Sequence, residues 1–160
     1  MEYPETNMIV QTPYKKKLRV GDIFILKYPS ELFLFGRIMK LDADIGGFPN
    51  CIKVHIYNLQ CKSADLPDGL INNPLLIAPV FLNRLGFSRG YMPIVANVEV
   101  EPHHNNDGAC YIDVFPKKRY VNELGEDTEK TDSVGAWGLS NYRTLDDDIS
   151  IAIGIPEASE

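Results

Sequence analysis

The sequence feature that most constrains the fold is an apolar hairpin pattern over residues 18–41. Two runs of β-branched, aromatic and aliphatic side chains, residues 23–26 and 32–35, are separated by the turn-forming pair Pro29-Ser30. Each run is apolar at consecutive positions, which predicts strands that are covered on both faces. We therefore expect a hairpin at the centre of a sheet, with Gly36 marking a bulge or bend in its second strand.

The segment that follows the hairpin, residues 51–59, alternates with a period of two and predicts another strand. One face presents Cys51, Lys53, His55 and Tyr57, and the other presents Ile52, Val54 and Ile56. On this strand we expect His55 to be half-exposed. Further strands are predicted at residues 75–82 (an edge strand, because it contains Pro79), 92–100, 109–115 and 117–122, with loops at residues 83–91 and 127–133.

The C-terminal region carries the end signals of a short helix. Thr144 or Asp146 can cap its start, acidic residues would occupy its first turn, Gly154 follows its end, and Pro156 prevents its continuation. The isoleucines of residues 149–153 also alternate as in a strand, which leaves that alternative open. The agreement of the two end signals favours the helix.

The many short strands and few helical patterns predict a mostly β or α+β fold. We expect a single domain built on a curled antiparallel sheet or a small β-barrel, with a short C-terminal helix. The predicted organisation is an N-terminal arm over residues 1–17, the β-rich domain over residues 18–155 and a tail over residues 156–160.

The charge balance limits the partners that the chain can bind. Its 16 basic and 22 acidic residues give a net charge of −6, which disfavours binding to nucleic acid, whose affinity depends on clustered Lys and Arg. The one basic run, residues 15–17 with Arg19, is short and is interpreted as a solvated segment. An acidic surface favours capture of a basic partner.

The cysteines and the chain's hydropathy pattern predict a cytoplasmic protein. The odd number of cysteines, Cys51, Cys61 and Cys110, lacks the spacing of a disulfide scaffold and indicates reduced thiols. No apolar run is long enough to span a membrane, and the N-terminus lacks the pattern of a signal peptide. We therefore expect no membrane partner.

Motifs for catalysis or metal binding are absent from the sequence. The three histidines, His55, His103 and His104, lack a metal-ligand spacing, and there is no GxSxG or phosphate-binding glycine motif. An enzyme that uses Cys110, His103 and an aspartate stays an open alternative. The acidic run of residues 146–148 is explained by a helix N-terminus. We therefore expect no catalytic residue, no metal and no cofactor.

Aromatic and arginine side chains in glycine-flanked loops are the usual anchors of protein–protein contacts. The candidate partner-binding residues are Arg84, Phe87, Arg89, Tyr91, Trp137 and Tyr142, together with the acidic Asp146, Asp147 and Asp148. The competing interpretation is that Phe87, Tyr91 and Trp137 close the core.

Three stretches together resemble one known family. GDIFILKYPSELFLFGRI (residues 21–38) is similar to the first hairpin of the immunity protein 26 family, LLIAPVFLNRLGFSRGY (residues 75–91) resembles its aromatic-Ser-Arg-Gly-aromatic signature, and WGLSNYRTLDDDISIAIGIP (residues 137–156) resembles its closing element. Gly86 stands where relatives are expected to have Pro.

The resemblance implies a bacterial polymorphic-toxin immunity protein. Such a protein stays in the cytoplasm of the producing cell and neutralises a cognate toxin domain by binding it, and the family has no catalytic residues to transfer to this chain. The alternative is a small-barrel interaction module that acts on nucleic acid or on a transcription or repair partner. The sequence does not define the oligomeric state.

Overall fold

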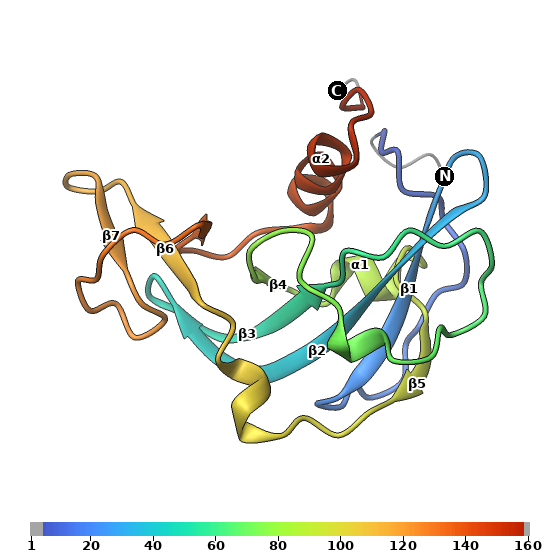
Figure 1. Ribbon diagram of the computed structural model, residues 1–160, viewed down its shortest axis with the longest axis horizontal. Coiled ribbons are helices and arrows are strands. Elements are labelled where there is room, and N and C mark those ends of the chain that lie inside the picture. The colour runs from blue at the N-terminus through green and yellow to red at the C-terminus, as the bar shows by residue number, and fades with distance from the viewer. Residues whose placement is uncertain (1–4, 159–160) are drawn as a thin grey trace.

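A computed structural model describes residues 5–158 and shows two β-sheets and a C-terminal helix (Figure 1). The larger sheet has the order β4-β3-β2-β1-β5, formed by β1 (Asp22–Tyr28), β2 (Leu32–Ile45), β3 (Phe48–Ile56), β4 (Val80–Leu82) and β5 (Ile94–Asn97). The smaller sheet has the order β7-β6-β8, formed by β6 (Ala109–Asp113), β7 (Arg119–Val121) and β8 (Ser133–Ala136). The helices are η1 (Leu70–Asn72), α1 (Leu85–Ser88), η2 (Pro102–Asn105) and α2 (Tyr142–Ile153).

The predicted central hairpin is confirmed. Strands β1 and β2 pair antiparallel, β1 also pairs with β5, and β2 also pairs with β3, so both strands lie inside the sheet. Residues 22–26 and 34–39 are buried without interruption. Covered strands of this kind require apolar side chains at consecutive positions, which is the pattern that predicted them.

The long β2–β3 hairpin carries side chains of three apolar clusters. The first core lies on one face of the larger sheet and includes Phe24, Ile38 and Val54. On the opposite face, a second core gathers around Phe81 and Tyr111, and a third around Ile23, Phe35 and Tyr57. The predicted alternation of residues 51–57 is confirmed, because Cys51 belongs to the second core and Tyr57 to the third, whereas Ile52, Val54 and Ile56 belong to the first.

Helix α2 and the N-terminal segment cover the first core. Leu145 and Ile149 of α2 are fully buried there, and Met8 is 2% exposed. The backbone N–H of Ile9 donates to the carbonyl oxygen of Lys27 at the end of β1, at 2.8 Å. The helix prediction for residues 146–153 is confirmed, whereas residues 1–4 of the expected arm and residues 159–160 of the expected tail lie outside the described residues.

Several local predictions are wrong. Gly36 stays in register with Phe24 and Ile56, and the shifts in β2 pairing come after Ile38. Residues 85–88 form the short helix α1 inside the expected loop, and β8 was not predicted. The curled-sheet alternative holds instead of the barrel, because β4 and β5 form open edges in the described part of the chain.

The start of α2 was also placed too late in the sequence. The helix begins at Tyr142, after Asn141, whose side-chain oxygen accepts the backbone N–H groups of Arg143 at 2.9 Å and Thr144 at 3.0 Å. The acidic residues 146–148 therefore lie in the second turn and do not meet the unpaired N–H groups of the first. At the other end, Gly154 adopts the left-handed conformation that the sequence predicted for it.

Gly36 is required by close packing. A Cβ atom at this position would lie 2.3 Å from Cζ of Phe24 and 2.9 Å from the carbonyl oxygen of His55. We expect Gly36→Ala to lower the free energy of unfolding by about 1–3 kcal/mol, measured by urea denaturation, because the Phe24 ring is fixed in the first core. The matched control is Gly138→Ala, which meets no atom within 4 Å and should change stability by less than about 0.5 kcal/mol. Equal effects of the two substitutions would contradict this account of Gly36.

Candidate functional site

Several of the predicted partner-binding side chains are buried. Phe87 is 0% exposed and meets Phe24 edge to face, with 5.4 Å between ring centroids. Tyr91 and Tyr142, each 2% exposed, stack at 4.7 Å, and Arg89 donates to the Tyr142 hydroxyl at 2.7 Å. These side chains join α1 to α2, and their binding to a partner stays a prediction.

Arg84 and Trp137 are half-buried. The guanidinium of Arg84 donates to the backbone carbonyls of Tyr14 (3.4 Å) and Lys16, which holds the N-terminal segment against α1. The ring of Trp137 packs on the second core and on Gly125. The role of Trp137 agrees with the competing interpretation that it closes a core, whereas the sequence did not indicate the role of Arg84.

Asp146 anchors the N-terminal segment. Its carboxylate is 1% exposed and accepts the backbone N–H groups of Asn7 and Met8, each at 2.8 Å. Its neighbours differ, because Asp147 is half-buried and Asp148 is exposed. Of the acidic run, Asp148 is therefore the residue most accessible to a partner.

A largely buried polar network, which the sequence did not reveal, joins the two sheets. It consists of Lys40, Lys53, His55, Asp107 and Glu123, and the charge of Arg37 acts on His55 beside it. The ammonium group of Lys53, 1% exposed, lies 3.0 Å from the carboxylate of Asp107 and 2.7 Å from that of Glu123. Nε2 of His55 lies 3.0 Å from the same Asp107 oxygen, and Lys40 pairs with Glu123.

The pKa shifts in the polar network follow from its burial. Burial lowers the pKa of His55, and the hydrogen bond with Asp107 offsets this only in part. Burial by itself would raise the pKa of Asp107, but His55 and Lys53 outweigh it and lower that pKa to about 2. The expectation that His55 is half-exposed was wrong, because the segment that contains η2 covers it and leaves it 4% exposed.

The polar network resembles an acid–base site in composition, but its side chains bind one another. Arg37 donates to the backbone carbonyl oxygens of Val98 (2.8 Å) and Glu99, so its guanidinium fixes the chain after β5. The suggested pair of Cys110 and His103 does not form, since Cys110 is buried and His103 packs on the ring of His104. Within residues 5–158, no group of three or more metal-ligating side chains gathers.

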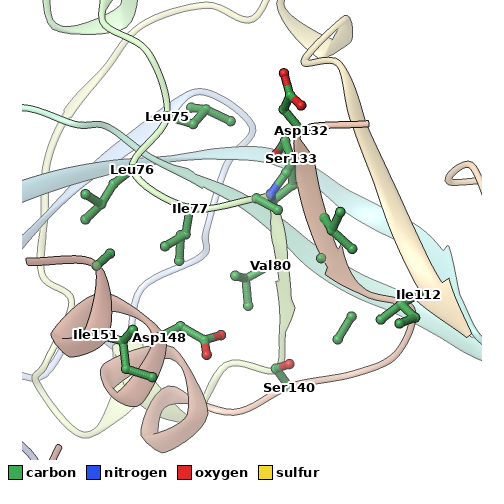
Figure 2. Close-up of a pocket in the computed structure, with 16 residues that line it drawn as sticks. Leu75, Leu76, Ile77, Val80, Ile112, Asp132, Ser133, Ser140, Asp148 and Ile151 are labelled. Carbon is green, nitrogen blue, oxygen red and sulfur yellow. The ribbon is translucent and has the colours of Figure 1, made fainter. Parts of the chain in front are cut away.

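A groove of about 580 Å³ is bounded by residues 75–80, by β8 and by α2 (Figure 2). We call it the α2 groove. Its apolar lining includes Leu76, Ile77, Val80 and Ile151. Figure 2 shows the carboxylate of Asp148 pointing from α2 into the groove. The sequence signal for this face of α2 is the spacing of residues 148, 151 and 152, which places them on one side of a helix.

Carboxylates border the α2 groove. Asp132 lies at its β8 end and Asp148 at its α2 side (Figure 2). Partial burial, together with the nearby Asp147 and Glu157 carboxylates, raises the pKa of Asp148. Among the described residues, no cation pairs with Asp132 or Asp148.

These features define a two-sheet α+β protein with a largely buried polar network and an open groove bordered by carboxylates. The sequence matches the family model of immunity protein 26 over residues 19–121 of 160, and the chain belongs to this family. The predicted family is therefore confirmed, and the match covers the first two of the three stretches that resembled it but not residues 137–156. The matched residues include β1 to β7, whereas β8 and α2 follow them. No curated protein and no solved structure matches the chain significantly.

We expect Asp146→Ala to lower the free energy of unfolding by about 1.5–3 kcal/mol, because two backbone N–H groups lose a charged acceptor in a buried position. Urea denaturation measures this loss, and faster proteolysis near Asn7 should accompany it. The matched control is Asp147→Ala, which removes the adjacent carboxylate and should have an effect below about 0.5 kcal/mol. A loss of equal size in both variants would argue against the anchoring role.

The polar network predicts that acid destabilises the protein in two stages. The pKa of His55 is lowered by folding, so the unfolded chain binds a proton first and stability falls as the pH drops below about 6.5. The contribution of Asp107 is present above about pH 4 and is lost toward its folded pKa of about 2. Urea denaturation at a series of pH values measures both stages.

The variant His55→Gln should flatten the upper stage, between about pH 7 and pH 5. A smaller slope should remain from His104, whose pKa is also lowered by burial and by Arg37. The control is Gln60→Asn, which changes an exposed side chain that does not titrate and should keep the wild-type slope. An unchanged slope in His55→Gln would show that another group senses the acid.

Proposed function

We propose that this chain is an immunity protein that binds a cognate bacterial toxin domain and neutralises it. Membership in the immunity protein 26 family carries this proposal, because the family's name is that of an immunity protein and the resemblance implies a toxin as its partner. The partner is therefore a protein, and neutralisation means that the bound toxin no longer reaches or converts its target.

We further propose that the chain acts by contact and catalyses no reaction. The polar network supports this, since Lys53, His55 and Asp107 satisfy one another and are at most 9% exposed at their side chains. A substrate could reach these groups only if the segment with η2 moved away. The family also implies a binding protein.

The charge of the chain suits a basic toxin. A net charge of −6 raises the association rate with a positively charged partner, and added salt lowers that rate. The same charge disfavours the alternative of a nucleic-acid-binding module. That alternative also expected a small barrel, whereas the described residues form two open sheets.

A cytoplasmic location is part of the proposal. It is supported by the three cysteines, which are all free and fit a reducing compartment. Across residues 5–158, none of the helices has the length and hydropathy needed to cross a membrane.

Co-expression tests the proposed function. We expect the chain to restore growth of cells that express the C-terminal domain of the protein encoded immediately upstream, and to form a one-to-one complex with that domain in native mass spectrometry. An unrelated acidic protein of similar size is the control for non-specific charge effects. Growth arrest in the presence of the chain, with no complex, would refute the proposal.

A further inference from the structure

We propose that the α2 groove is the toxin-docking site and that it receives a segment of the toxin with an apolar side chain flanked by Lys or Arg. This inference rests on the proposed function and names the surface and the partner chemistry for it. The occupant is a segment of the cognate toxin domain.

The two faces of α2 give the first argument. One face packs into the first core with Leu145 and Ile149, both 0% exposed. The other face turns Asp148, Ile151 and Ala152 toward the groove. Ile151 is 62% exposed although it lies on a well-formed helix next to other apolar side chains. An apolar surface of this kind gains free energy when a partner covers it.

The shape of the groove gives the second argument. Residues 75–80 form one wall, β8 forms another, and the groove between them has a volume of about 580 Å³. This volume holds a few side chains and is in the range of sites that bind ligands. Binding energy at protein interfaces concentrates in such pockets, where a side chain of the partner becomes fully desolvated.

Charge gives the third argument and selects the partner. Asp132 and Asp148 line the groove without a cation among the described residues, whereas Asp107, Glu123 and Asp113 each form an ion pair. Asp147 and Glu157 add negative charge beside Asp148. The last twenty residues of the sequence contain five acidic residues and one arginine. A Lys or Arg of the partner would relieve this repulsion.

A second exposed apolar surface differs in charge. At the turn between β6 and β7, Val114 is 70% exposed and Phe115 is 81% exposed. Lys117 and Lys118 follow after Pro116, so this turn would attract an acidic surface. It therefore serves as a comparison in the test.

The experiment measures binding of the inactivated C-terminal domain encoded immediately upstream, by calorimetry. We expect Asp148→Lys to weaken binding at least about tenfold because it introduces a repulsive charge. We expect Ile151→Ala to weaken binding about tenfold by removing an apolar contact. Both side chains are exposed, and Ala favours helices, so both variants should keep the wild-type melting temperature.

Matched controls carry corresponding substitutions, Asp to Lys and an aliphatic residue to Ala, on another surface. Asp68→Lys and Leu66→Ala change exposed side chains of the loop before η1 and should alter affinity less than twofold. Phe115→Ala should also leave affinity unchanged. Replacing Lys or Arg of the toxin by Glu, one at a time, should identify a position that restores binding to Asp148→Lys.

The outcomes separate the two proposals. If the wild-type chain neither binds nor protects, the proposed function fails and the docking site falls with it. If the wild-type chain binds and protects but the groove variants bind equally well, or only Phe115→Ala loses affinity, the proposed function stands and the α2 groove is overturned as the docking site.

Discussion

The ion pairs of Lys53 hold the two sheets in their relative positions. Its ammonium group is buried on β3 and meets Asp107, which precedes β6, and Glu123, which follows β7. Lys53 of the larger sheet thereby binds the chain both before β6 and after β7. A buried ammonium group without partners would be strongly destabilising. Burial of Lys53 in the folded sheet therefore requires that these two carboxylates pair with it.

The position of the groove follows from this attachment. Strand β8 pairs with β6 in parallel, so the wall that β8 contributes depends on where β6 is held. The opposite wall depends on the first core, which fixes α2 through Leu145 and Ile149. The groove therefore lies between elements that belong to different sheets, and neither sheet would form it alone.

Four carboxylates of the chain illustrate two different roles. Asp107 and Asp146 are buried and satisfied by hydrogen bonds, and the fold depends on them. Asp132 and Asp148 border the groove and have no cation among the described residues. The first two stabilise the fold, whereas the last two stay open to the positively charged partner that we propose.

The sequence determined the features that depend on neighbouring residues. These are the covered β1–β2 hairpin, the alternating faces of β3, the end of α2 at Gly154 and the family. It placed Lys53 and His55 on one face of β3. It did not predict Asp107 as their partner, because more than fifty residues separate Asp107 from Lys53 in the sequence. The tertiary structure decided which distant groups meet and where a groove remains, because buried charged groups are stable only in an arrangement that pairs them.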